Sequence, residues 1–241
     1  MKKNIVLISL LVLSISSFAQ GGYVLGVRGG VGIGTLYNSN GFNDINLTYK
    51  PSLVWHVYGS AGYNATYYNF GFMMDFGIQQ YQSQISIRDT STALDIEELH
   101  KLMYFELPLM MRIRPQGNKV TREFTLGGPY FEIGIKPGFL LSAKFERDSA
   151  ASITNADVKP FYETITFGAF IGFGIHQVGL ENFGLTHGIR ISYDFLDITS
   201  AAGGKGDVYT NGDPYKGTHP VSISYQMSLH FKFAKWGGNR R

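Results

Sequence analysis

Residues 129–146 read PYFEIGIKPGFLLSAKFE, and apolar side chains alternate in this stretch with polar or small ones. The apolar set is Phe131, Ile133, Ile135, Phe139, Leu141 and Phe145. The polar or small set is Glu132, Gly134, Lys136, Gly138, Ser142, Lys144 and Glu146. A period of two residues places these sets on opposite faces of a β-strand. The stretch therefore predicts one long strand with an apolar face and a polar face.

The same alternation recurs along the chain and predicts eight strands in all. They span 22–36, 49–60, 66–82, 101–114, 129–146, 161–177, 183–197 and 221–233. These ranges are much longer than the roughly 5–6 residues that are commonest in globular proteins. They are long enough to cross a bilayer at a tilt.

Two architectures use such alternation with opposite senses. A soluble sandwich or lipocalin-like barrel turns its apolar face inward, whereas an outer-membrane barrel turns it toward lipid. The polar face here is rich in small residues such as Gly168, Gly172 and Gly174, which suit a narrow interior. The apolar face is almost free of charge, and in the last five strands only Glu163 and His187 interrupt it. We therefore predict an all-β fold, an eight-stranded antiparallel up-and-down transmembrane β-barrel.

The first residues have the pattern of an export signal. Lys2 and Lys3 precede an apolar run at 5–13 that is interrupted only by Ser9, and a small-x-small triplet follows at 17–19. The apolar run is far shorter than the roughly 20 residues that a membrane-spanning helix needs. This pattern predicts a signal peptide at 1–19 and a barrel domain at 20–241.

The predicted connections alternate between long and short. The long ones span 37–48, 83–99, 147–160 and 198–219. Those at 61–65 and 178–182 are short, whereas 115–128 departs from the alternation. Outer-membrane barrels have short periplasmic turns and longer external loops. The four long connections are therefore expected outside the cell.

Residues 104–111 read YFELPLMM, which resembles the Tyr-x-Glu-[Ile/Leu]-Pro-Leu signature of the PorT-like outer-membrane β-barrel family. Further pieces that are similar to strands of this family lie at 129–134, 138–141, 167–174 and 229–233. The resemblance covers essentially the whole mature chain. It implies outer-membrane localisation and a role as an accessory to type IX secretion or envelope assembly. The chain departs from the family at 234–241, so the last strand ends at either Phe233 or Trp236.

Composition excludes several classes of site. The chain has no cysteine, which excludes disulfides, thiolate metal ligands and cysteine nucleophiles. Its net charge is +3 with no basic run, so a nucleic-acid partner is not expected. The histidines stand singly, without the spacing of a metal site; they are His56, His100, His176, His187, His219 and His230. We expect no catalytic, cofactor-binding or metal-binding residues.

Three weaker sequence patterns can be interpreted either as functional sites or as ordinary structural features. His100 and His219 are predicted at the outer rim, where an enzymatic site is the alternative to solvated histidines. The acidic residues expected near them are Asp95, Glu97, Glu98 and Asp213. Residues 148–150 are similar to an O-glycosylation acceptor centred on Ser149, and otherwise form a polar loop. The glycines between Gly26 and Gly34 lack the spacing of a phosphate-binding loop and are predicted to relieve crowding inside the barrel.

The predicted interior carries many charges, which should pair because unpaired charges in a narrow space are costly. The inward set is Arg28, Lys50, Asp75, Glu106, Arg112, Arg114, Glu132, Lys136, Lys144, Arg190, Asp194, His230 and Lys232. We expect Glu106 and Arg112 to meet Glu132 or Lys136 from the adjacent strand. Pro108 and Pro137 lie in mid-strand, and we expect a bulge at each.

These patterns predict an outer-membrane protein with a structural or interaction role, without enzymatic activity. It would present loops outside the cell, and the resemblance to PorT suggests an accessory to type IX secretion or envelope assembly. The alternative is an outer-membrane enzyme that acts on lipid or peptide at the extracellular rim. The expected partners are outer-membrane lipid and envelope or secretion-complex proteins.

Overall fold

The computed structural model of the chain describes residues 22–44, 46–64, 70–88, 95–113, 128–148, 153–180, 183–203 and 215–232. The predicted signal peptide at 1–19, Arg114, Ser149 and the two candidate ends of the last strand, Phe233 and Trp236, lie outside these residues. No helix among the described residues has the length and apolar character that crossing a membrane requires.

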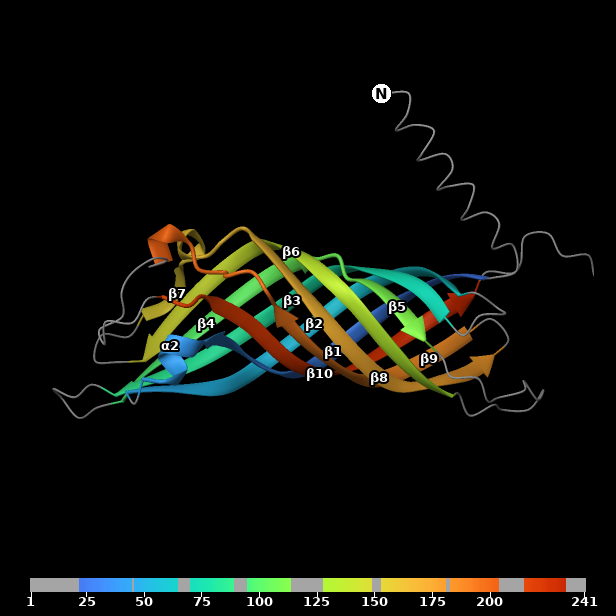
Figure 1. Cartoon of the computed structure of the whole chain (residues 1–241), viewed down its shortest axis with the longest axis horizontal. Helices are drawn as coiled ribbons and strands as arrows, with labels where there is room; N and C mark the ends of the chain where they lie inside the picture. Colours follow the sequence, from blue (N-terminus) through green and yellow to red (C-terminus); the bar gives the residue numbers. More distant parts are fainter. Residues whose placement is uncertain are drawn as a thin grey trace, which may run out of the picture.

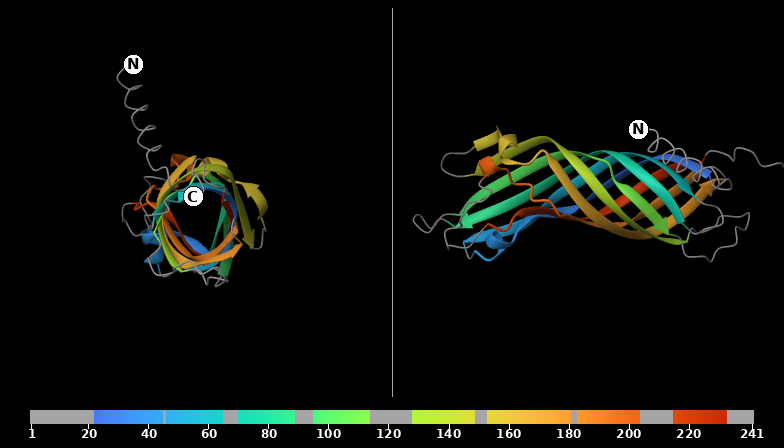
Figure 2. Two further views of the ribbon diagram at one scale, coloured as in Figure 1. Left: turned by 90° about the vertical axis from the view of Figure 1, so that its right-hand side faces the viewer. Right: turned by 45° about the horizontal axis from the view of Figure 1, so that its top comes forward.

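The described chain forms a tilted antiparallel β-barrel (Figures 1 and 2). Its strands are β1 (Gly22–Asn38), β2 (Leu47–Asn64), β3 (Phe70–Arg88), β4 (Asp95–Glu106), β5 (Leu109–Ile113), β6 (Pro129–Asp148), β7 (Ile153–Asp157), β8 (Ile165–Leu180), β9 (Phe183–Asp194) and β10 (Thr218–Lys232). Short helical segments are α2 (Ser39–Phe42), η1 (Lys159–Phe161) and η2 (Ala201–Gly203).

The ring closes because β1 pairs with β10 as well as with β2. The β1–β10 register runs from Val24 opposite Lys232 to Asn38 opposite Thr218. The end-on view in Figure 2 shows the closed ring. Closure leaves no strand edge within the wall that the described residues form, which is the condition that lipid imposes on a spanning sheet.

The eight predicted wall strands are confirmed, although the sheet contains ten segments. β4 and β5 are two halves of one wall strand, since both pair with β3 and with β6. β7 is a short addition that pairs only with β6 among the described strands. The predicted loop 83–99 is wrong in extent, because β3 continues to Arg88 and β4 begins at Asp95.

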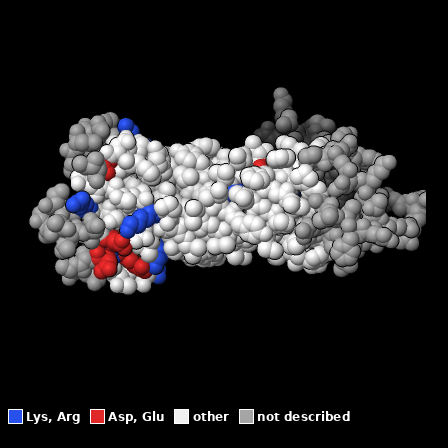
Figure 3. All heavy atoms as spheres, turned by 90° about the horizontal axis from the view of Figure 1, so that it is seen from below, with Lys and Arg blue, Asp and Glu red and all other residues white. Residues whose placement is uncertain are grey.

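The two ends of the barrel differ in what they carry. One end, here called the loop end, holds α2, β7, η1 and η2, whereas β1 begins and β10 ends at the opposite end (Figure 1). Acidic and basic residues gather at the loop end, and the middle of the wall is almost free of them (Figure 3). The outer surface is apolar instead, with side chains about half exposed; examples are Val27, Val31, Phe72, Phe131, Ile133 and Ile171. This is the surface that faces hydrocarbon in a membrane barrel.

The bulges predicted at Pro108 and Pro137 are absent. Glu106 lies opposite Gly138 and Leu109 opposite Ile135, so the register is unbroken between them. Leu107 N–H donates to the Pro137 carbonyl at 3.0 Å. Each proline therefore removes only its own donor from the ladder, while its carbonyl still accepts; the Pro108 carbonyl accepts from the Asp75 N–H at 2.8 Å.

A bulge does occur in β6, and it corrects two predicted side-chain directions. Met103 pairs with Ser142 and Tyr104 with Leu140, which leaves Leu141 without a partner opposite it. One extra residue reverses the alternation of everything beyond it. Lys144, predicted inside, is therefore exposed, and Phe145, predicted toward lipid, packs against interior residues.

Strand glycines make room for close packing inside the wall, as predicted. A Cβ on Gly32 would lie 2.0 Å from the backbone oxygen of Ile223 on the neighbouring strand. A Cβ on Gly172 would lie 2.7 Å from the Glu132 side chain. Larger residues at these positions would displace the adjacent strand or the buried carboxylate.

Candidate functional site

Eight charged side chains fill the middle of the barrel interior. Each is at most 5% exposed. The cations are Arg28, Arg112, Lys136 and Arg190, and the anions are Asp75, Glu106, Glu132 and Asp194. The described interior charges of this layer therefore balance. We refer to them together as the charge layer.

Glu132 is the centre of one half of the charge layer. Its carboxylate lies 3.1 Å from Arg28, 3.2 Å from Arg112 and 2.8 Å from Arg190. Gln226 donates a further hydrogen bond to it at 2.7 Å. Three strands other than its own thus supply cations to one carboxylate. Arg28 also lies 3.1 Å from the Asp75 carboxylate and donates to the Gln226 side chain at 3.1 Å.

Lys136 is the centre of the other half. It pairs with Asp194 and lies 3.6 Å from Glu106. Tyr58 donates to Glu106 at 2.7 Å, and the Lys136 ammonium donates to the Tyr81 hydroxyl at 2.5 Å. The predicted meeting of Arg112 with Glu132 and of Glu106 with Lys136 is confirmed. An eight-stranded barrel is only wide enough for side chains to fill, and here they interlock across it.

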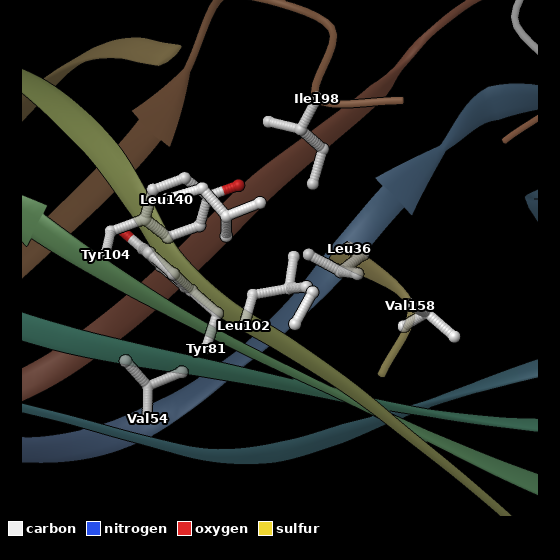
Figure 4. Packing of buried hydrophobic residues seen from close by; sticks show 9 residues of the cluster. Leu36, Val54, Tyr81, Leu102, Tyr104, Leu140, Val158 and Ile198 are labelled. Carbon is white, nitrogen blue, oxygen red and sulfur yellow. The ribbon is translucent and has the colours of Figure 1, made fainter. Parts of the chain in front are cut away.

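An apolar layer follows the charge layer toward the loop end. Its members are Leu36, Val54, Tyr81, Leu102, Tyr104, Leu140, Ala143, Val158 and Ile198. Figure 4 shows them entering the lumen from several strands and from the connecting segments. Ile198 is fully buried although it lies outside any strand. Its segment is drawn inward because its amide donates to Thr218 O at 3.0 Å and its carbonyl accepts from Glu163 N.

Beyond the apolar layer a half-enclosed cavity of about 450 Å³ opens at the loop end. We call it the mouth cavity. Its apolar floor includes Leu36, Ile85 and Val158. Aromatic rings form much of the wall, namely Tyr49, Phe145, Phe161 and Tyr162. Its size falls in the range of small-molecule sites.

One side of the mouth cavity is polar. Arg147 donates to Glu98 Oε1 through Nε at 2.9 Å and through Nη2 at 2.5 Å. His100 Nε2 lies 3.7 Å from Glu98 Oε2, and His100 Nδ1 lies 2.7 Å from the Tyr162 hydroxyl. Burial, and then the nearby Glu98 carboxylate, raises the pKa of Tyr162 above its ordinary value, so the hydroxyl stays protonated at neutral pH.

Tyr162 reaches His100 because two connecting segments are tied together over the mouth. Tyr162 and Thr199 form a β-bridge. Asp197 accepts hydrogen bonds from the Thr199 N–H, the Thr218 N–H and the Tyr215 hydroxyl at 3.0, 2.9 and 2.8 Å. These bonds hold residues 197–200 against β10 and η1, and thereby fix the position of Tyr162.

The structure brings some of the predicted rim residues together and separates others. His100 and Glu98 meet inside the mouth, whereas His219 stacks on Tyr193 with ring centroids 5.6 Å apart. Glu97 pairs instead with Lys50 at 2.6 Å, and both side chains are more than two-fifths exposed, so Lys50 is not an interior residue. Asp213 lies outside the described residues.

Two residues of this polar wall were missed by sequence reasoning. Arg147 faces inward only because of the Leu141 bulge, and Tyr162 depends on a bridge between distant segments. No short motif marks either of them. Within the described part of the chain, no group of three or more His, Asp or Glu side chains is arranged to hold a metal ion.

Comparison with solved structures finds small membrane barrels of low sequence identity. Neisserial surface protein A is 12% identical, with 88% of this chain and 97% of that chain covered and a TM-score of 0.41. OprG from Pseudomonas aeruginosa is 11% identical, with 88% and 96% covered and a TM-score of 0.42. Ail of Yersinia pestis is 11% identical, with 88% and 99% covered and a TM-score of 0.38. No curated protein matches the chain.

The sequence profile described as "Outer membrane protein beta-barrel domain" matches residues 18–200, which is most of the chain. The closed antiparallel ring, the apolar outer wall and the polar interior agree with that description. The chain therefore belongs to the outer membrane protein β-barrel domain family and is a protein of the outer membrane.

Proposed function

We propose that this protein is a plugged scaffold of the outer membrane that acts through its loop end, which faces outside the cell. The observation that carries the proposal is the balanced charge layer, whose side chains are almost fully buried across the lumen. A lumen filled in this way leaves solute passage without a route. The protein would then act through its exposed surfaces. Among these, the charged loop end differs from the apolar, lipid-facing wall (Figure 3).

The partner that we propose is a protein of the envelope, in an accessory role to type IX secretion or envelope assembly. The support for this finer assignment is the resemblance of residues 104–111 to the PorT-like signature. Photo-crosslinking tests it. A crosslinking amino acid at Phe161, exposed in η1, should capture a defined envelope protein in living cells. The same group at Phe131, exposed on the lipid-facing wall, is the matched control.

Capture of one protein from Phe161 and not from Phe131 would support the interaction role. Deletion of the gene should then reduce secretion of type IX cargo if the accessory role is right, and unchanged secretion would contradict that role. Crosslinking to lipid alone at both positions would contradict the scaffold proposal as a whole.

A second candidate is an enzyme that acts on lipid or peptide at the rim, and the contacts of His100 favour it. The imidazole forms a hydrogen bond with the Tyr162 hydroxyl through Nδ1, and its Nε2 lies 3.7 Å from the Glu98 carboxylate. The order of the three groups is that of acid, general base and hydroxyl in hydrolases, although the contact with the acid is longer than a hydrogen bond. The test is hydrolysis of ester and peptide substrates by the purified barrel. Activity that His100→Ala abolishes would establish an enzyme, and absence of turnover would reject it.

A further inference from the structure

Among the described residues, the polar wall of the mouth cavity combines hydrogen-bond donors and acceptors that are not fully used. Arg147 uses two of the five guanidinium donors for Glu98, and its side chain is 40% exposed. Glu98 Oε2 lies 3.7 Å from His100 Nε2, beyond hydrogen-bond distance, so it can still accept. A ligand on this wall therefore finds a donor group and an acceptor group side by side.

On the same wall the charges of Glu98 and Arg147 compensate each other. An ionic ligand would lose its hydration without meeting an uncompensated opposite charge, which is unfavourable. A neutral ligand with adjacent hydroxyl groups avoids this cost. Each hydroxyl both donates and accepts, so neighbouring hydroxyls can accept from Arg147 and donate to Glu98.

The remaining lining of the mouth cavity is mostly aromatic and aliphatic. Tyr49, Phe145, Phe161 and Tyr162 line the cavity together with the aliphatic floor. Arg147 is held at the wall by its position over the Phe145 ring, 5.3 Å from the centroid. Aromatic faces pack well against a body that is apolar on its own faces and polar at its edge. A pyranose ring has this distribution, with C–H groups on its faces and hydroxyls around its edge.

The geometry points to a binding site for a neutral saccharide in the mouth cavity, with ring faces packed on the aromatic wall and hydroxyls bonded to Arg147 and Glu98. This inference goes beyond the scaffold role and does not depend on a secretion partner. The apolar layer closes the cavity from below, so the saccharide enters and leaves at the loop end. The shared chemistry is the neutral sugar, whether it is free or attached to a surface lipid.

Saturation-transfer NMR on the refolded full-length mature barrel tests the site directly. The protein is kept in lauryl dimethylamine oxide, because a detergent with a sugar headgroup would compete. The probes are maltose, cellobiose, chitobiose and lactose, with benzoate and tetramethylammonium as charged comparisons. We expect millimolar or tighter binding of at least one disaccharide and of neither ion. A second arm with nanodiscs that contain a neutral glycolipid asks whether lipid-linked sugar competes for the site.

Two variants make the test specific. Arg147→Met keeps the side-chain stem and removes the donors, and it should weaken disaccharide binding at least tenfold. Lys101→Met makes the same kind of change in the Lys101–Glu146 pair, which does not line the mouth cavity, and should leave binding unchanged. Heat-modified gel migration verifies that both variants are folded. Absence of disaccharide binding, preference for either ion, or equal losses in the two variants would overturn the inference.

Discussion

Replacing Glu132 by Gln is predicted to destabilise the barrel strongly. The change keeps the shape of the side chain and removes a charge that lies within 3.2 Å of three guanidinium groups. Asp75 remains close to Arg28 at 3.1 Å and to Arg190 at 3.7 Å. Among the described contacts, Arg112 keeps only its position over the Tyr130 ring, 4.7 Å from the centroid. One almost fully buried cation is therefore left without an anion.

The expected cost follows from the loss of one partner in a buried ion pair. Such a change typically costs about 3–5 kcal/mol, because the remaining charge stays desolvated and uncompensated. The amide oxygen of Gln can still accept a hydrogen bond, which places the expected value near the lower end, at about 3 kcal/mol. The matched control is Glu146→Gln, which removes the acid of the partly exposed Lys101–Glu146 pair. Exposed pairs contribute about 0–1 kcal/mol.

The assay is urea-dependent unfolding in lipid vesicles, followed by heat-modified migration on gels. A second substitution sharpens it. In Glu132→Gln/Arg112→Gln the uncompensated cation is also removed, so stability should partly recover, and the double-mutant cycle measures the coupling. Equal losses for Glu132→Gln and Glu146→Gln, or no recovery in the double variant, would refute the account of the charge layer.

Further outcomes follow from the same structure. In planar-bilayer recording the protein should give no steady, voltage-independent conductance, and a large open current would show that the lumen is not plugged. Leu109→Arg, on the lipid-facing wall, should cost about 2–4 kcal/mol in vesicle unfolding, whereas Leu109→Met should be close to neutral. Protease added to intact cells should cleave the protein after Lys205 or Lys216. Cleavage only in permeabilised cells would show that the orientation is opposite to the proposed one. Because burial raises the pKa of Tyr162, the folded state keeps this hydroxyl neutral while the unfolded chain ionises. Stability should therefore fall above about pH 10, and Tyr162→Phe should lessen that fall.

The sense of the barrel could be predicted from the sequence because lipid constrains every wall strand in the same way. Glu106, Arg112 and Glu132 each occupy a polar position in an alternating strand, and all three are buried inside. Even the pairing of Arg112 with Glu132 follows from the adjacency of consecutive strands. The two-residue period of each strand and the order of the strands along the chain are enough to predict these side-chain directions and this pairing.

The predicted side-chain directions were wrong where one extra residue shifts the alternation of a strand. The Leu141 bulge exchanges the directions of Lys144 and Phe145, and nothing in the local sequence marks it. Gln226 shows a different limit. The alternation of the last strand places it on the lumen face but does not reveal that it bonds both Arg28 and Glu132. A fifth cation at that place would disturb a balanced layer.

The candidate site was only half predictable. Glu98 and His100 were expected near each other at the rim, but the predicted strand began only at residue 101, so their common face became evident only from the observed extent of β4. Tyr162 is held in the polar wall by its β-bridge to Thr199. The Asp197 hydrogen bonds that anchor this segment join residues distant in the sequence. Contacts of that kind depend on the folded connections and have no local signal.

The order of the interior layers predicts that a solute can reach the mouth cavity only from the loop end. An ion that entered from the end where β1 begins would meet the charge layer, and beyond it an apolar layer in which Leu102 and Ile198 are fully buried. Moving an ion into such apolar surroundings is costly whatever the state of the charges below. The two barriers are therefore independent, and loss of one interior charge should destabilise the barrel without opening a pore. Glu132→Gln should remain non-conducting, because the apolar layer alone separates the mouth cavity from the rest of the lumen.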